Sequence, residues 1–299
     1  MFNTELNTAI NLAIAAGEEI MRLHKDGFEV ETKKLNHNFT EPVTSADKRA
    51  NELIVSELKN LFSEDGILSE ESEDDLNRLD KKRVWIIDPI DGTKGFVEGA
   101  DDFAVQIGFV YESKPVVGVV YQPAQKRLFF ASENKGAFLV ENEKTPRRLH
   151  VNEKNEIDDM ILAVSRLHKS PKLSEITSRL RFKQEIQHGS VGLKIGLIAE
   201  GKADLYIHLS PHTKLWDTCA PQVILEESGG ILTDLFGEKL NYHSSDTQNY
   251  NGILATSRAC HEQILSKLIP ILKEIGRLKL KKSPNEIREA KLHDQNTQK

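Results

Sequence analysis

Four segments rich in β-branched and aromatic residues follow one another between residues 103 and 140, separated by short polar or Gly/Pro turns. This spacing predicts an antiparallel β-meander, so the first half of the chain must contain an antiparallel sheet. The four predicted strands are Phe103–Tyr111, Pro115–Tyr121, Arg127–Ala131 and Gly136–Val140.

Helical patterns precede the meander. Apolar residues recur at helical spacing from Leu6 to Met21, and a second apolar stripe runs from Ala46 to Leu61. The stretch from Thr44 to Asp47 resembles a capping box, which predicts that the second helix begins there. Val84–Ile87 is a short apolar run that ends at Asp88-Pro89, as expected of a buried strand that stops at a loop.

Predicted strands and helices alternate in the second half of the chain. The strands are expected at Met160–Ser165, Ala203–Leu209, Ile231–Leu235 and Gly252–Thr256, and the helices at Ser190–Glu200, Asp217–Ser228 and Ala259–Ile275. We therefore expect an N-terminal α+β lobe with an antiparallel sheet over residues 1–150 and a C-terminal α/β lobe over 151–276. Residues 277–299 are polar and are expected to form a flexible tail.

Composition excludes several classes of protein. The 299 residues include 40 Lys+Arg and 46 Asp+Glu, and this net charge of −6 lacks the basic footprint of a protein that coats nucleic acid. Two cysteines exclude a disulfide framework and a four-thiolate zinc site. No export signal is evident, and no apolar run reaches the ~20 residues that span a bilayer. The expected protein is soluble and cytoplasmic, with no membrane partner.

The most informative motif runs from Asp88 through Pro89, Ile90 and Asp91 to Gly92-Thr93. Two carboxylates three residues apart stand where a buried strand meets a glycine-containing turn, and they can face one point. Oxygen ligands without His or Cys favour a hard divalent cation such as Mg²⁺ over zinc. An ordinary Asp/Gly turn remains the alternative at this stage.

Three further acidic sites, four residues in all, help to decide between a metal site and an ordinary turn. Glu70 and Glu71 follow the β-like segment Gly66–Leu68, and Asp47 and Asp217 each stand at the start of a predicted helix. Taken singly, Glu70 and Glu71 fit a solvated acidic loop. The two aspartates fit carboxylates that favour a helix N-terminus.

Taken together, these motifs resemble those of the inositol monophosphatase superfamily of Mg²⁺-dependent, lithium-sensitive phosphomonoesterases. The order is Glu70-Glu71, then Asp88-Pro89-Ile90-Asp91-Gly92-Thr93, then Trp216-Asp217 ahead of Gly229-Gly230. The resemblance covers residues 43–235 and implies an α/β layered sandwich, αβαβα, of the sugar-phosphatase type.

Other segments resemble the CysQ-type 3′(2′),5′-bisphosphate nucleotidase branch of the superfamily. Asp91 to Phe96 matches its first motif, and Ser165-Arg166-Leu167-His168 resembles a second. Gly189-Ser190, with Lys194 and Ala199 to Tyr206, resembles a third. This likeness implies hydrolysis of 3′-phosphoadenosine 5′-phosphate to AMP and phosphate, and it implies that Ser165, Arg166, His168, Gly189, Ser190 and Lys194 bind the substrate.

The resemblance also implies roles for the acidic core. Glu70, Asp88, Asp91, Asp217 and the Ile90 carbonyl are expected to hold two or three Mg²⁺ ions, which activate the attacking water. Thr93 is expected to orient that water and Asp47 to accept its proton, while the backbone N–H groups of Gly92 and Thr93 bind phosphate.

Other functions remain open from the sequence. An inositol monophosphatase or another sugar-phosphate phosphatase shares the same metal core. A non-catalytic protein that binds a phosphorylated metabolite is a different class, and a scaffold whose acidic loop and tail bind partners is a third. The expected partner is a small phosphorylated metabolite and not a nucleic acid polymer. Because members of the family are often dimers, a homodimer is also an expectation.

Overall fold

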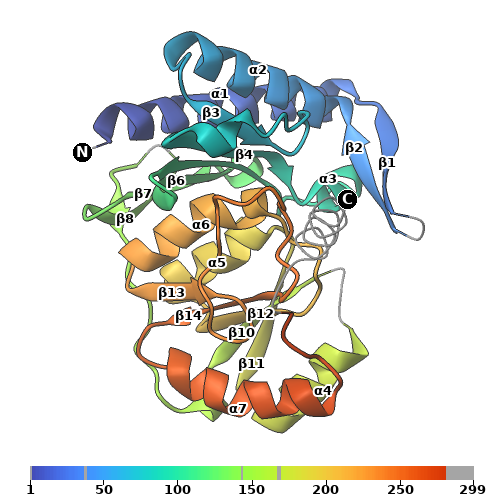
Figure 1. Ribbon diagram of the computed structural model, residues 1–299, viewed down its shortest axis with the longest axis vertical. Helices are drawn as coiled ribbons and strands as arrows, with labels where there is room; N and C mark the ends of the chain where they lie inside the picture. The colour runs from blue at the N-terminus through green and yellow to red at the C-terminus, as the bar shows by residue number, and fades with distance from the viewer. Residues whose placement is uncertain (1, 37–38, 143, 167–169, 281–299) are drawn as a thin grey trace, which may run out of the picture.

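The computed structural model describes residues 2–36, 39–142, 144–166 and 170–280. They form five layers, helices–sheet–helices–sheet–helices, stacked from one end of the molecule to the other (Figure 1). The outer helices α1 (Asn3–Asp26) and α2 (Ser45–Leu61) form the first layer, and α4 (Pro171–Leu180) and α7 (His261–Glu274) form the last. The expected αβαβα sandwich is confirmed.

The first sheet has seven strands in the order β3-β4-β5-β6-β7-β8-β9. All neighbouring pairs are antiparallel except β3–β4, so the predicted meander is confirmed. The strands are β3 (Gly66–Ser69), β4 (Arg83–Asp91), β5 (Ala104–Tyr111), β6 (Lys114–Gln122), β7 (Arg127–Ser132), β8 (Gly136–Glu141) and β9 (Arg147–Arg148).

The second sheet has five strands in the order β11-β10-β12-β14-β13. Strand β10 runs parallel to both neighbours, and the remaining pairs are antiparallel. The strands are β10 (Ile161–Ser165), β11 (Gln184–His188), β12 (Leu205–His208), β13 (Gly230–Thr233) and β14 (Ile253–Ser257). Helix α4 and strand β11 were not predicted. The lobe boundary proposed at residue 150 stays a prediction.

Helices α5 (Val191–Ala199) and α6 (Leu215–Glu227) fill the layer between the two sheets (Figure 1). Separate apolar clusters lie on either side of this layer, represented by Phe129 with Leu193 and by Ile195 with Tyr206. Eight of the nine residues of α5 are buried, because the helix contacts both sheets. Burial of this apolar surface is the main force that holds the layers together.

Two glycines let α6 approach the first sheet closely. A Cβ at Gly118 on β6 would overlap the backbone oxygen of Ala220, and one at Gly108 on β5 would lie 2.5 Å from Cys219 Sγ. Any side chain at these positions would push the helix away from the sheet. The glycines therefore set the position of the N-terminus of α6 relative to the end of β4.

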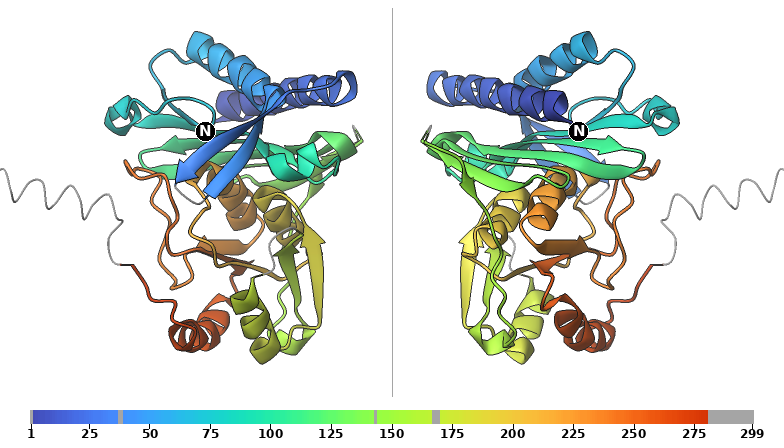
Figure 2. Two further views of the ribbon diagram at one scale, coloured as in Figure 1. Left: turned by 90° about the vertical axis from the view of Figure 1, so that its right-hand side faces the viewer. Right: turned by 90° about the vertical axis from the view of Figure 1, so that its left-hand side faces the viewer.

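A two-stranded antiparallel hairpin, β1 (Val30–Asn36) and β2 (Phe39–Thr44), leaves the helical layer and runs across the edge of the seven-stranded sheet (Figure 2). This hairpin was not predicted.

Of the predicted tail, residues 277–280 are described; Arg277 donates to Tyr250 O and Leu280 N donates to Asn251 Oδ1. The rest of that prediction lies outside the described residues. Within the described part, no helix combines the length and apolar character that a membrane crossing requires.

Candidate metal centre and active site

Asp88 and Asp91 stand at the end of β4, three residues apart. In a regular strand, residues with this odd separation point to opposite faces of the sheet. Here Asp88 pairs with Gln106 and Asp91 pairs with Ala104 on β5, so β4 contains one more residue than its partner. This bulge turns both carboxylates toward the same side.

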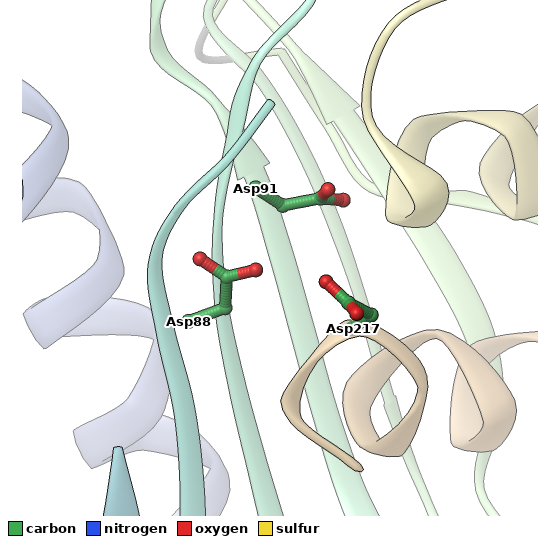
Figure 3. A group of neighbouring side chains, drawn as sticks. All are labelled: Asp88, Asp91 and Asp217. Atoms are coloured by element: carbon green, nitrogen blue, oxygen red, sulfur yellow. The ribbon is translucent and has the colours of Figure 1, made fainter. Parts of the chain in front are cut away.

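Asp217 reaches the same point from the middle layer of helices. It is the third residue of α6, and its Oδ2 accepts a hydrogen bond from Lys214 N at 2.6 Å. One carboxylate oxygen from each of Asp88, Asp91 and Asp217 lies within 4.8 Å of the other two. Figure 3 shows the three groups converging between the end of β4 and the start of α6.

Without a cation, the ionised forms of the three carboxylates are unfavourable, because the groups are buried and lie close to other negative charges. Burial raises the pKa of Asp91, and burial with the charge of Glu70 raises the pKa of Asp88. Burial and the charge of Asp91 raise the pKa of Asp217 to about 8. In addition, Asp88 Oδ1 is buried without a hydrogen-bond partner. Oxygen ligands that repel one another, one of them unpartnered, fit a bound metal cation, which would reverse both penalties.

Gly92 and the short helix α3 (Thr93–Val97) follow the bulge. Gly92 has a φ of 100°, a left-handed conformation that favours glycine, and it turns the chain into the helix. Thr93 Oγ1 thereby lies 2.9 Å from Ile90 O and 3.2 Å from Asp47 Oδ1. The predicted pair of Thr93 and Asp47 is therefore in hydrogen-bond contact.

Asp47 is buried at the third position of α2. Its Oδ2 accepts hydrogen bonds from Thr44 N at 2.7 Å and Thr44 Oγ1 at 2.6 Å, which completes the predicted capping box. Burial raises the pKa of Asp47 to about 6, against the lowering effect of these bonds. The carboxyl group thus both caps α2 and faces Thr93 through its other oxygen.

Asp88, Asp91 and Asp217 line one cavity of about 450 Å³ with Thr93, whereas Asp47 lies behind Thr93 and is not part of the lining. Glu70 belongs to it, and burial together with the charges of Asp217 and Glu71 raises its pKa well above the usual range. The hairpin residue Glu41 lies in the same wall. The lining residues are Thr40, Glu41, Pro42, Glu70, Asp88, Ile90, Asp91, Gly92, Thr93, Lys94, Val191, His208, Ser210, His212, Thr213, Lys214, Trp216 and Asp217.

Two of the residues predicted to bind substrate, Ser190 and Lys194, are not part of the cavity lining. Ser190 is buried, and its hydroxyl donates to Asp91 Oδ2 and accepts from Leu193 N. Lys194 is also buried, and its ammonium donates to the backbone oxygens of His188, Gly189 and Ser190. Contact of these two side chains with substrate stays a prediction.

Arg166 forms an ion pair with Asp102 at 2.8 Å, and Asp102 Oδ2 also accepts from Gly189 N at 2.5 Å. Ser165 ends β10 opposite His188 of β11. These residues lie beside the cavity rather than in its lining, and their role in binding stays a prediction. His168 lies outside the described residues.

The sequence interpretation missed part of the cavity wall. Glu41 comes from the unpredicted hairpin, His208 ends β12, and Ser210, His212 and Lys214 follow that strand. It also missed Asp102 and Gln106, which contact Gly189 and Asp91. The sequence held one signal for the 208–214 loop: it lies between a predicted strand and Trp216-Asp217, which suggests that it borders the site.

Comparisons with known proteins agree with this geometry. The model of the inositol monophosphatase family, a family of metal-dependent phosphatases, matches residues 3–274. The 3′(2′),5′-bisphosphate nucleotidase CysQ from Salmonella typhimurium is 33% identical over 238 residues, which cover 79% of this chain and 93% of that protein.

Solved structures show the same fold. The IMPase from Thermotoga maritima superposes with a TM-score of 0.75 at 26% identity and covers 91% of this chain and 99% of that one. CysQ from Bacteroides thetaiotaomicron, a bacterial member of the inositol monophosphatase family, gives a TM-score of 0.70 at 29% identity, with 86% and 98% covered. This chain therefore belongs to the inositol monophosphatase family and is a phosphatase.

Proposed function

We propose that this chain is a Mg²⁺-dependent 3′(2′),5′-bisphosphate nucleotidase that hydrolyses 3′-phosphoadenosine 5′-phosphate to AMP and phosphate. The observation that carries the metal-dependent part is the convergence of three carboxylates within 4.8 Å, one with an unpartnered oxygen. The 33% identity to the CysQ nucleotidase supports the choice of substrate.

Asp88, Asp91 and Asp217 hold the Mg²⁺ ions, together with Glu70 and the Ile90 carbonyl. Hard oxygen donors of this kind suit Mg²⁺, because it prefers carboxylates, carbonyls and water as ligands. The ions, when bound, supply positive charge that attracts the phosphate dianion, activates water and stabilises the leaving oxygen.

Thr93 and Asp47 handle the proton of the attacking water. Thr93 Oγ1, which lies 3.2 Å from Asp47 Oδ1, orients that water, and Asp47 accepts the proton directly or through Thr93. A pKa of about 6 leaves Asp47 ionised at neutral pH, in the form that a general base requires. The N–H groups of Gly92 and Thr93 bind phosphate oxygens.

The second half of the chain recognises the rest of the substrate. Lys194 and Ser190 hold the turn at residues 188–190 in place. The side chains or backbone of six residues bind the second phosphate or the nucleoside: Ser165, Arg166, His168, Gly189, Ser190 and Lys194. Homodimer formation and a cytoplasmic location stay predictions from the sequence.

A second candidate function is an inositol or other sugar-phosphate phosphatase, which the likeness to the Thermotoga IMPase structure favours. Steady-state kinetics on 3′-phosphoadenosine 5′-phosphate and inositol 1-phosphate, measured side by side with and without lithium, separates the two. We expect the larger kcat/KM for the bisphosphate nucleotide and inhibition by lithium. A larger kcat/KM for inositol 1-phosphate would contradict the proposed substrate, and turnover of neither would contradict both candidates.

A further inference from the structure

Gln106 on β5 is fully buried, and its side chain contacts Asp91, one of the three clustered aspartates. Its side-chain Nε2 donates to Asp91 Oδ2 at 2.5 Å. A carboxylate can only accept hydrogen bonds, so the NH₂ group of the amide must face Asp91. In the antiparallel pairing of β4 with β5, Gln106 lies directly opposite Asp88.

Asp91 Oδ2 receives two other donors. The Ser190 hydroxyl and the backbone N–H of Gly192, which is 2.8 Å away, both belong to the start of α5. Three donors from two different layers therefore converge on one oxygen. The other oxygen of Asp91 takes part in none of these bonds, and the carboxyl group lies near that of Asp217 (Figure 3).

The amide of Gln106 is held in a confined space. Its Oε1 is buried with no hydrogen-bond partner, and a Cβ at Gly192 would lie 2.8 Å from that oxygen. A buried polar atom without a partner destabilises a fold, and a hydrocarbon side chain of similar volume would avoid that penalty. The packing of β5 therefore gives no reason for an amide here, whereas the carboxylate of Asp91 does.

We propose that Gln106 is a positioning residue for the metal centre. Its Nε2 fixes Asp91 Oδ2, with Ser190 and Gly192, so that Oδ1 is presented to the space shared with Asp88 and Asp217. This inference deepens the proposed function and rests on its metal-binding part. Groups that orient metal ligands through a hydrogen bond change metal affinity without touching the metal.

The test compares Gln106→Met with Gln122→Met. Gln122, on β6, is an equally buried glutamine whose Nε2 donates to Asp101 O at 2.9 Å and whose Oε1 also has no partner. Both substitutions remove a buried amide from the same sheet, but only Gln106 contacts Asp91. Mg²⁺ binding is measured on purified protein by isothermal titration calorimetry, after circular dichroism has confirmed the fold.

We expect Gln106→Met to weaken Mg²⁺ binding by about 10–100-fold, as loss of a ligand-orienting group does, and Gln122→Met to leave it unchanged. Stability without Mg²⁺ should not fall more in the first variant than in the second. Gly192→Ala, which displaces the Gln106 amide by its Cβ, should also weaken Mg²⁺ binding and provides the test if Gln106→Met does not fold.

Three results would overturn the inference. Equal Mg²⁺ affinity in Gln106→Met and the wild type would show that the amide does not position Asp91. Equal weakening in Gln122→Met would show a general effect of loosening the sheet. Absence of Mg²⁺ binding by the wild-type protein would overturn the proposed function as well, whereas the first two results leave that function intact.

Discussion

Asp47 and Asp217 occupy the same position, the third residue, of two different helices, and each accepts a hydrogen bond from the backbone N–H three residues earlier. Thr44 N is the donor to Asp47, and Lys214 N is the donor to Asp217. Both carboxylates therefore serve as helix caps through one oxygen, while Asp217 lines the cavity and Asp47 contacts Thr93, which lines it. The helix-capping role of these aspartates is therefore compatible with the functional roles proposed for them.

Replacement of Asp91 by Asn should abolish turnover with little effect on the fold. The oxygen of the new amide can accept the hydrogen bonds that Asp91 Oδ2 accepts, but its NH₂ group then replaces a charged ligand. We expect kcat to fall by at least about 10³-fold at saturating Mg²⁺. The exposed Asp101, changed to Asn, is the matched control and should keep wild-type kcat. Near-normal activity of Asp91→Asn would refute the assignment.

Replacement of Asp47 by Asn should separate catalysis from metal binding. The amide oxygen preserves the cap at Thr44, but an amide cannot accept a proton from water. We expect kcat to fall by about 10²–10⁴-fold, the usual contribution of a general base. Mg²⁺ affinity, measured by calorimetry, should stay close to the wild-type value. A variant that keeps full kcat would exclude Asp47 as the base.

The acidic centre also predicts how stability depends on pH without metal. The pKa of Asp47 is about 6 and that of Asp217 about 8, whereas an unfolded aspartate titrates near ~3.9. The folded state thus holds protons that the unfolded state has released, so the contribution of these two groups to the free energy of unfolding falls as pH rises through this window.

Thermal unfolding in EDTA between pH 4 and pH 9 measures this effect, with Asp217→Asn as the comparison. The variant cannot ionise at this position, so its Tm should exceed that of the wild type by an amount that grows with pH. Mg²⁺ should raise the wild-type Tm at pH 8 more than at pH 5. A Tm difference independent of pH would contradict the raised pKa of Asp217.

The close approach of α6 to the first sheet predicts a coupled loss of stability and activity. In Gly118→Ala, the new Cβ would overlap Ala220 O, so the helix must move. We expect the free energy of unfolding, measured with urea, to fall by about 1–3 kcal/mol, as in other overpacked cores. Because α6 carries Asp217, kcat/KM per folded molecule should fall as well. Unchanged stability would show that the contact is not constrained.

Local sequence patterns predicted most of the central elements. Helix α7, expected at Ala259–Ile275, spans His261–Glu274, and β6, expected at Pro115–Tyr121, spans Lys114–Gln122. These elements have continuous or periodic apolar residues because they are buried on one or both faces. The same reasoning failed for β11, whose sequence Gln-Glu-Ile-Gln-His is polar and whose position depends on pairing with β10.

Helix α4 carried a signal that the sequence interpretation passed over. Ser170 caps its N-terminus by accepting from Leu173 N, and Pro171 is its first residue. Both features are typical of a helix start. The hairpin of β1 and β2 has no comparable signal, so its contribution of Glu41 to the cavity was not predictable.

The convergence of the acidic residues was predictable from the sequence, but the β-bulge that produces it was not. Motif order and resemblance singled out Asp88, Asp91 and Asp217, whereas the bulge that turns the first two to one side depends on pairing with β5. Burial is equally non-local. Packing of α5 between the sheets buries both Ser190 and Lys194, which no local pattern indicates, and their expected contact with substrate stays a prediction.

In the proposed function, three carboxylates from two layers of the fold bind Mg²⁺ and make this chain a phosphatase for a bisphosphate nucleotide. Phosphate release from 3′-phosphoadenosine 5′-phosphate, measured on EDTA-treated protein and again after Mg²⁺ is added back, tests it most directly. We predict no release in EDTA and full recovery with Mg²⁺. Release that persists in EDTA, or none at any Mg²⁺ concentration, would contradict the claim.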